Sequence, residues 1–507
     1  MRYFEDVLTP RGMREREREA FRRGVSSLLL MEDAARAIHA SLKFLLREGS
    51  RVLVICGPGN NGGDGAALGR LLRQDGYQVL LVGAGAPATD DARTMRAYYE
   101  ALGGEAVDCL STDDLQEIAA KAEAFRPDCV VDALFGTGFH GVPEGMHADL
   151  IRLVNALGAK VVLAVDIPSG MNGEDGSAAA DPASGKPLCV RATDTITLGC
   201  WKTGLFRTRQ PALAGRLALA PIALPADAPE AAVRLIREEA FRWIPPRACD
   251  THKGRAGRVL MYMGSLGMAG AAAMAARAAL RAGAGLVTVA CPREIIPVLQ
   301  TLVPNAMCVP AETLAERVPA HDVLAAGCGL GQSAETRERL AALLARETET
   351  AVLDADALNI LAETPFDLPE RTVITPHPAE AARLLHTSLE TVLDDPLSSA
   401  RALAEKYRAV ALLKGYVSFV SDGQAIVVQR RGAPALAKGG SGDVLAGILA
   451  ALCADPTICA EFDGSHRLLY TAALASMCLG IAGERAQARY GDRAALTGDV
   501  IDALALQ

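Results

Sequence analysis

The chain is poor in aromatic residues, and it lacks patterns that would assign it to several specialised classes of protein. Phe, Trp and Tyr make up 4% of its 507 residues. Twelve cysteines are present, but none form a CxxC pair, which argues against a zinc ribbon or a thioredoxin-like redox site. We interpret them as free thiols of a protein from a reducing cytoplasm.

The chain also lacks an excess of basic residues and long apolar runs. Acidic residues outnumber basic ones by 60 to 52, which gives a net charge of −8 and argues against a nucleic-acid partner. No apolar run approaches the length of a membrane span, and the alanine-rich stretch 271–280 is interrupted by Arg277. The charged run Arg14–Glu19 near the start does not resemble a signal peptide. We expect a cytoplasmic protein without a membrane partner.

Glycine is abundant, with 48 residues, and apolar strand patterns alternate with helical ones. This alternation predicts an α/β fold with mostly parallel sheets, and the length predicts more than one domain. In the first half the expected strands are 51–57, 78–84, 129–135, 160–167 and 194–200. The expected helices between them are 66–75, 92–102, 113–124 and 147–157.

A proline-rich stretch at 221–247 interrupts the alternation and predicts a linker. A second α/β series follows it and includes a hairpin around Ser421–Gly423. Its expected strands are 258–263, 285–290, 306–309, 323–327, 350–354, 372–375, 409–414, 417–420 and 425–429. Its expected helices are 270–282, 334–346, 378–387, 397–406 and 443–454, with further helix after 465.

The segment Gly57–Gly65, Gly-Pro-Gly-Asn-Asn-Gly-Gly-Asp-Gly, follows the apolar run Arg51–Cys56. An apolar strand, a glycine loop and a helical pattern in this order are typical of an anion or nucleotide site. The spacing is neither GxGxxG nor a Walker loop. Ligands of parallel sheets bind at the carboxyl ends of the strands, so the loops at Asp132–Gly138, Asp166–Gly170 and Gly199–Gly204 belong to the same candidate site.

In the second half, Lys438–Asp443 reads Lys-Gly-Gly-Ser-Gly-Asp and precedes a helical pattern. Amides of a glycine turn at a helix start can bind a phosphoryl group, and Asp443 could accept a proton from a hydroxyl. Asp443 could equally be a helix cap. Polar groups follow other predicted strands at Asp354–Asn359, Thr375–Glu380 and Lys414. Asp354 and Asp356 could be turn residues, His377 could be structural, and Glu380 could cap its helix.

Together these motifs resemble the bifunctional NAD(P)H-hydrate repair enzymes, in which an epimerase domain is fused to an ADP-dependent dehydratase domain. The resemblance spans nearly the whole chain. It rests on the motifs above and on Met31–Glu32, Thr195–Gly204, Lys253–Gly254, Met268–Thr288 and Gly327–Gly331. It implies a Rossmann-like three-layer epimerase domain at 1–222, a linker at 223–245 and a ribokinase-like dehydratase domain at 246–507.

The resemblance implies that the substrate is NADH or NADPH hydrated at C6 of the nicotinamide ring. The epimerase domain would interconvert the R and S hydrates, and the dehydratase domain would convert the S hydrate to NAD(P)H while ADP becomes AMP and phosphate. Small molecules would be the binding partners, and a homo-oligomer is expected.

For the epimerase, the resemblance implies Asp166 as the proton-transfer group, with Lys202 as a second candidate. It also implies a potassium ion held by Asn61, Asp132 and Ser169; the residues alone would make Asp132 a turn residue. The substrate would contact Asn60, Asn61, Gly62, Gly63, Asp64, Gly136, Thr137, Gly138, Phe139, His140, Gly141, Val142 and Asp166.

For the dehydratase, the resemblance implies Asp443 as the catalytic base and magnesium with the phosphates. The hydrate would contact Ala271, Gly331, His377 and Asp443. The nucleotide would contact Lys414, Gly415, Tyr416, Val417, Ser418 and Gly442. The chain departs from the family pattern at Asp33, Cys328, Ala379, Ser441 and the turn 264–267, none of which is a proposed reacting group.

Two other functions fit parts of the sequence. A ribokinase-like small-molecule kinase would use the same glycine loop and Asp443, although it would not need the first domain. A non-enzymatic dinucleotide-binding protein would keep the first domain without its chemistry.

Overall fold

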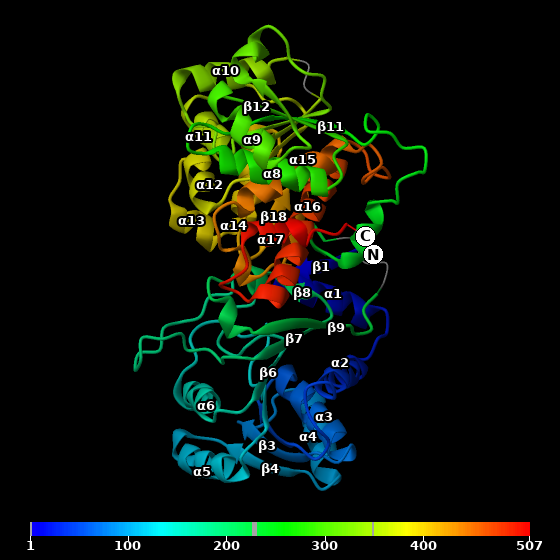
Figure 1. Ribbon diagram of the computed structural model, residues 1–507. Coiled ribbons are helices and arrows are strands. Elements are labelled where there is room, and N and C mark those ends of the chain that lie inside the picture. The colour runs from blue at the N-terminus through cyan, green and yellow to red at the C-terminus, as the bar shows by residue number, and fades with distance from the viewer. Residues whose placement is uncertain (1–2, 226–230, 347–348, 507) are drawn as a thin grey trace. The chain divides into compact units, whose positions relative to one another are not determined.

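The computed structural model describes residues 3–225, 231–346 and 349–506, and it divides into two compact units (Figure 1). The N-terminal unit is Asp6–Ala231. The C-terminal unit is Ala232–Gln507 together with Met1–Glu5. No helix among the described residues is long and apolar enough to cross a membrane.

The N-terminal unit is built on a parallel sheet with strand order β4-β3-β2-β5-β6-β7-β9. These strands are β2 (Arg51–Cys56), β3 (Gln78–Ala84), β4 (Glu105–Cys109), β5 (Cys129–Ala133), β6 (Val161–Val165), β7 (Asp194–Leu198) and β9 (Arg216–Ala220). Strands β1 (Phe4–Leu8) and β8 (Trp201–Lys202) pair in parallel through Val7 and Leu8.

Helices cover both faces of this sheet because successive strand residues point to opposite sides. Val52 and Val54 pack against one set of helices, which includes α2, α3 and α4, whereas Leu53 and Ile55 pack against α5 and α6. The helices are α1 (Pro10–Arg22), α2 (Ser27–Leu42), α3 (Asn60–Gln74), α4 (Asp90–Ala101), α5 (Leu115–Phe125), α6 (Gly145–Ala156) and α7 (Thr203–Arg207). The predicted three-layer α/β class is confirmed for this unit.

The predicted loop Gly57–Gly65 is too long at its C-terminal end, because helix α3 already begins at Asn60. Its first six residues include three glycines that sit against other groups. A methyl group on Gly62 would come within 1.8 Å of the Gly57 carbonyl oxygen, and one on Gly63 would meet Met31 at 2.7 Å. Close packing therefore requires glycine here, despite its poor helix propensity.

The C-terminal unit contains a second, mostly parallel sheet with strand order β13-β12-β11-β14-β15-β16-β17-β18-β19-β10. Its strands are β10 (Val233–Ile236), β11 (Arg258–Tyr262), β12 (Leu286–Cys291), β13 (Met307–Pro310), β14 (Val323–Ala326), β15 (Thr350–Leu353), β16 (Thr372–Ile374), β17 (Val410–Leu413), β18 (Ser418–Ser421) and β19 (Ile426–Gln429). The predicted hairpin is confirmed, because β18 pairs antiparallel with β19.

The helices of the C-terminal unit are α8 (Ala269–Arg281), α9 (Ile296–Leu302), α10 (Ala334–Leu344), α11 (Asp356–Glu363), α12 (Pro378–Leu385), α13 (Leu389–Asp394), α14 (Pro396–Tyr407), α15 (Ser441–Ala454), α16 (Gly464–Tyr490) and α17 (Thr497–Asp502). Helices α8, α15 and α16 share the core with the sheet. Gly447 of α15 lies directly on the Ala275 carbonyl of α8, where a methyl group would come within 2.2 Å. This close packing fixes the start of α15, which carries Asp443.

Part of the predicted linker 223–245 is folded structure of the C-terminal unit. Residues 226–230 lie outside the described residues, but Val233–Ile236 form β10 and Glu238–Trp243 form a 3-10 helix. Residues 3 and 4 belong to the same unit: the Tyr3 and Phe4 rings lie 5.0 and 5.6 Å from the Trp243 ring. Prolines at 245 and 246 follow these elements instead of interrupting them.

Candidate functional site

The N-terminal unit contains a cavity of about 570 Å³ at the carboxyl ends of β2, β5 and β6. Predicted substrate residues line it: Asn60, Asn61, Asp64, Gly136, Thr137, Gly138, Phe139 and Asp166. Gly62, Gly63, His140, Gly141 and Val142 are not among its lining residues in the described structure, and the last three lie on an exposed loop. The two glycines have the packing role in α3 described above.

Asp166 and Lys202 form a buried ion pair in this cavity. The Lys202 Nζ lies 2.5 Å from Asp166 Oδ1 and donates a second bond, also of 2.5 Å, to the Leu198 carbonyl. Asp166 Oδ1 also accepts from the Thr197 hydroxyl and the Leu198 amide, at 3.1 and 3.2 Å. Asp166 has φ +72°, which is unusual for a residue with a side chain, so the fold holds this carboxylate in a strained position.

Three more carboxyl groups, those of Glu17, Asp64 and Asp91, line the same cavity. Burial, with the Asp166 charge adding to it, raises the pKa of Asp64 well above its ordinary value. Burial also raises the pKa of Glu17. The Lys202 charge lowers this pKa and the Asp166 charge raises it, but burial has the largest effect. The cavity thus combines an ion-paired carboxylate with two carboxyl groups of raised pKa, the pairing used in general acid–base catalysis.

Asp132 and Ser169, predicted to hold a cation, lie side by side. The Ser169 hydroxyl donates to Asp132 Oδ1 at 2.6 Å and accepts from the Phe135 amide at 2.8 Å. Burial raises the pKa of Asp132 to about 6. Asn61 approaches the next residue of the same loop, because a methyl group on Gly136 would lie 3.4 Å from the Asn61 amide oxygen. That buried oxygen has no hydrogen-bond partner in the described structure.

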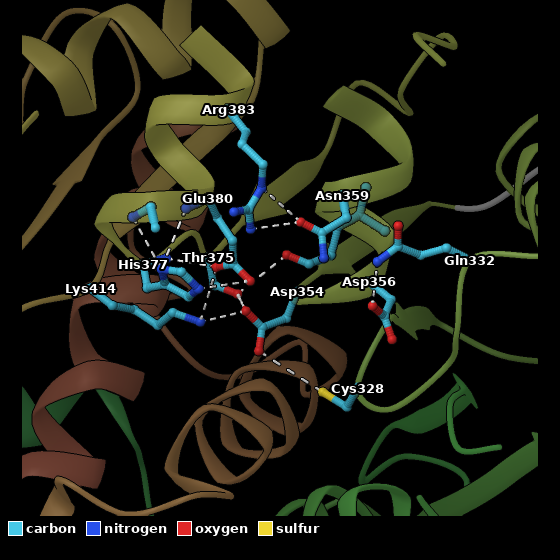
Figure 2. Close-up of polar contacts among 12 residues, drawn as sticks. Cys328, Gln332, Asp354, Asp356, Asn359, Thr375, His377, Glu380, Arg383 and Lys414 are labelled. Carbon is cyan, nitrogen blue, oxygen red and sulfur yellow. Dashed lines mark hydrogen bonds and ion pairs between the residues drawn. The ribbon is translucent and has the colours of Figure 1, made fainter. Parts of the chain in front are cut away.

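In the C-terminal unit, polar groups from three neighbouring strand ends meet at Asp354, which follows β15 (Figure 2). Asp354 Oδ1 accepts from the Lys414 ammonium at 2.6 Å and from the Thr375 hydroxyl at 2.8 Å. Because β15, β16 and β17 are adjacent and parallel, residues 21 and 60 positions from Asp354 reach the same point.

Lys414 lies between two carboxylates. Burial lowers its pKa, but Asp354 and Glu380 outweigh that effect and leave the pKa of Lys414 above its ordinary value. Glu380 Oε2 is 3.9 Å from the ammonium and also accepts from the His377 amide at 2.8 Å. His377 caps α12 by accepting at Nδ1 from the Ala379 amide, and burial holds the pKa of His377 low. The cap role considered for Glu380 is present, and the structural role considered for His377 takes the form of a helix cap.

Asp443 lies in the first turn of α15, next to the glycine loop and close to Asp354. Gly440, the cap of this helix, has φ +96°, a conformation that favours glycine. A methyl group on Gly442 would lie 3.4 Å from Asp354 Oδ2 and 3.6 Å from Lys414 Nζ. Burial raises the pKa of Asp443 to about 6. The glycine loop, an ammonium and a carboxyl with raised pKa therefore share one site.

Cys328 lies between the two aspartates. Its thiol hydrogen-bonds Asp443, and its Sγ is 4.0 Å from Asp354 Oδ2. Burial and these two carboxylates raise the pKa of Cys328 well above its ordinary value, so it remains a thiol that can donate. Sequence reasoning noted Cys328 only as a departure from a family pattern and left Asp354 open. The signal in the sequence was that both residues closely follow predicted parallel strands, now β14 and β15, whose carboxyl ends meet at one edge of the sheet.

The other predicted site residues of the C-terminal unit do not all lie in this cluster. The Gly331 amide donates to Asp356 Oδ2 at 2.8 Å, and Gln332 donates to the other oxygen (Figure 2). Ala271 is buried in α8. In the segment 414–418, Tyr416 is 74% exposed whereas Ser418 is buried in β18. The structure brings Gly442, Lys414 and Asp443 together, and Tyr416 points outward from that group.

Comparison with known proteins gives matches over both units. A family model described as YjeF-related protein N-terminus matches residues 27–204, and one described as NAD(P)H-hydrate dehydratase matches residues 259–505. The bifunctional NAD(P)H-hydrate repair enzyme Nnr of Moorella thermoacetica is 36% identical over 95% of this chain and 92% of its own length. The chain belongs to the bifunctional NAD(P)H-hydrate repair enzyme family.

Other members of this repair enzyme family match over similar lengths. The Coxiella burnetii protein is 37% identical over 88% of this chain and 89% of its own. The Escherichia coli protein is 35% identical over 89% and 84%, respectively. Among solved structures, an ADP/ATP-dependent NAD(P)H-hydrate dehydratase from Bacillus subtilis, co-crystallised with ATP/Mg²⁺, is 25% identical, with a TM-score of 0.46, over 53% of this chain and 94% of that one.

Proposed function

We propose that this protein repairs hydrated NADH and NADPH in two steps. The unit Asp6–Ala231 would interconvert the R and S hydrates, and the unit with Ala232–Gln507 would dehydrate the S hydrate at the expense of ADP. Family membership over 95% of the chain carries this proposal. The two polar sites, one in each unit, support it.

In the epimerase cavity, Asp166 would exchange a proton with the hydrated ring. Lys202 keeps the Asp166 carboxylate paired at 2.5 Å, and the Thr197 and Leu198 donors fix its direction. Asn60, Asp64 and the loop 136–139 would bind the rest of the substrate. A geometry set by three donor contacts and a strained backbone suits a group that must act at one atom.

Potassium fits the neighbouring loop, because an unpartnered amide oxygen of Asn61 accompanies carboxylate and hydroxyl oxygens of Asp132 and Ser169. These three residues would hold the ion, and hard oxygen donors are what such a cation requires. The ion would supply positive charge next to the loop 134–136, which lines the substrate cavity.

In the dehydratase site, Asp443 would take the proton of the C6 hydroxyl as its oxygen attacks the β-phosphorus of ADP and AMP leaves. The amides of Gly440–Gly442 and the Lys414 ammonium would stabilise the transferred phosphoryl group. Loss of phosphate from C6 and of a proton from C5 would then restore the ring double bond. Asp354 would hold Lys414 in place through their 2.6 Å contact.

Magnesium also fits this site. Asp354 Oδ2 makes no contact in the described structure other than the thiol of Cys328 at 4.0 Å, and it faces Gly442. It is a free oxygen donor of the type that magnesium binds. The ion would neutralise phosphate charge, with Asp354 as its protein ligand.

The direct test is product analysis with purified hydrates. S hydrate plus ADP should give NAD(P)H, AMP and phosphate, and R hydrate should react after epimerisation. Asp166→Ala should stop R-to-S interconversion without affecting dehydration of the S form, and Asp443→Ala should do the reverse. A simple kinase would instead phosphorylate a small alcohol from ATP and leave the hydrates unchanged, which would refute the proposal.

A further inference from the structure

Inversion at C6 needs chemistry on both faces of the ring, and Asp166 serves one. The cavity offers a second carboxyl group on α1, which precedes the region matched by the N-terminal family model. We infer that Glu17 is the second catalytic group of the epimerase, the acid that protonates the departing C6 oxygen. This inference rests on the proposed epimerase activity.

Helix α1 packs directly on the segment that carries Lys202. A methyl group on Gly199 would meet the end of Met13 at 2.7 Å, and the Arg16 guanidinium donates to Cys200 Sγ at 3.4 Å. Arg16 is also paired with Asp6 at 2.5 Å, which anchors the helix further. Because residues four apart share a helix face, Glu17 lies on the same face as Met13, directed to the Gly199–Lys202 segment.

The Glu17 side chain is open to the cavity and unused by the fold. It is half-buried and lines the cavity, yet it makes no hydrogen bond or ion pair with another described residue. Glu15 and Glu19 of the same helix point elsewhere and pair with arginines of α1. The fold has no structural need for the Glu17 carboxyl, because this group is unpaired and faces the cavity that contains the Asp166–Lys202 pair.

Asp64 is the competing candidate, and its position argues against it. It is 8% exposed near the start of α3, where burial strongly favours its neutral form. A group that must lose and regain a proton in each turnover needs contact with water. Glu17 has that contact, so we assign hydrogen bonding to Asp64 and proton donation to Glu17.

The reaction balances with these two groups. Glu17 gives a proton to the C6 hydroxyl, the C6–O bond breaks, and water leaves as the N1 lone pair forms a C6=N1 iminium. Water then attacks the opposite face, a new C6–O bond forms, N1 regains its lone pair, and Asp166 takes the proton released by that water. In the reverse direction the two groups exchange roles, so the net change is inversion at C6.

The experiment compares Glu17→Gln with the wild type in water enriched in oxygen-18, using R hydrate. Wild-type epimerisation should place the label at C6. Glu17→Gln should lower kcat for epimerisation at least about 100-fold with KM changed less than about threefold, as expected for loss of a general acid. Dehydration of S hydrate by the same variant should be unchanged, which shows that the C-terminal unit is folded, and the nearly unchanged KM for epimerisation shows the same for the cavity of the N-terminal unit. Glu15→Gln, an exposed matched control, should keep wild-type epimerisation.

The pH dependence of the epimerisation rate distinguishes an acid from a residue with a structural role only, because a purely structural Glu17 would not change it. The charged groups around Glu17 are Arg14, Asp64, Asp166 and Lys202. The wild-type rate should fall as the pH rises through the pKa of Glu17, which burial raises above its ordinary value. Glu17→Gln should lack that decline, and Glu17→Asp should restore it in part. Wild-type kcat in Glu17→Gln, absence of label at C6, or loss of labelling in Asp64→Asn alone would overturn the assignment. A wild type that does not interconvert the hydrates would instead refute the proposed function.

Discussion

At the scale of single residues, the decisive property of the dehydratase site is the raised pKa of Asp443. Burial beside Asp354 makes the ionised form of Asp443 costly, so its pKa rises to about 6. A base with a pKa close to the working pH is ionised at pH 7 and still holds a proton strongly. This is the compromise that general-base catalysis favours.

The dehydration rate should therefore depend on pH through Asp443. A base acts when ionised, so kcat/KM for S-hydrate dehydration should fall about tenfold per pH unit below about pH 6. A rate that stays constant down to pH 5 would contradict the assignment of Asp443 as base. The measurement is a steady-state rate profile in constant-ionic-strength buffers.

The same shift has a consequence for stability. Because the folded pKa of Asp443 lies above its ordinary 3.8, the ionised carboxylate destabilises the fold, and the penalty grows as pH rises from about 4 to about 6. Asp443→Asn should raise the free energy of unfolding by about 1–3 kcal/mol at pH 7 and by little at pH 4. Denaturant titration of the inactive variant at both pH values tests this.

Asp354 should matter more for stability than its neighbour Thr375. Asp354→Ala leaves the buried Lys414 ammonium without its closest counter-charge and should cost about 3 kcal/mol. Thr375→Val removes one hydrogen bond to the same carboxylate and should cost about 1 kcal/mol. Equal losses in denaturant titrations would mean that the ion pair is not what stabilises this site.

At the scale of elements, the loops after parallel strands could be predicted, but their internal pairing could not. The sequence places Asp354, Thr375 and Lys414 at strand ends, yet it does not say which of them touch. That depends on the order β15-β16-β17, which brings together residues 60 positions apart. The start of α3 was predicted too late because glycine is a poor helix former, and packing on Gly57 and Met31 decides the conformation instead.

The loop Leu134–Gly136 leads to a prediction about potassium. Potassium chloride should raise the melting temperature of the protein more than sodium chloride at the same ionic strength, because binding to the native state stabilises it. Asp132→Asn should remove the difference. Since the pKa of Asp132 is about 6 without the ion, the potassium effect should also weaken below that pH. Equal stabilisation by both salts would count against Asn61, Asp132 and Ser169 as ligands.

At the scale of the whole molecule, the membership of the first residues in the C-terminal unit could not be predicted from the sequence. Composition suggested a boundary near 222, but it gave no sign that Tyr3 and Phe4 belong with residues more than 200 positions later. Phe4 packs on Trp243 and Tyr470 at ring distances of 5.6 and 5.1 Å, and the Arg234 guanidinium lies 4.5 Å from its ring centre. Such contacts leave no local pattern in a sequence.

Phe4→Ala should destabilise the C-terminal unit by about 2–4 kcal/mol, because a large aromatic side chain is removed from a ring cluster. The matched control is Phe44→Ala, a side chain that is 91% exposed and should change stability by less than about 0.5 kcal/mol. Tryptophan fluorescence follows the transition through Trp243. Similar effects of the two variants would contradict the role of Phe4.

The position of Tyr3 and Phe4 also has a consequence for biosynthesis. These residues are synthesised before the rest of the C-terminal unit, and their ring partners Trp243 and Tyr470 are made more than 200 residues later. At typical rates of about 5–20 residues per second, the N-terminal strand must wait on the order of 10–100 s with its rings unburied. The whole Asp6–Ala231 unit is translated in that interval. The dehydratase unit can therefore complete its folding only after the epimerase unit has been synthesised.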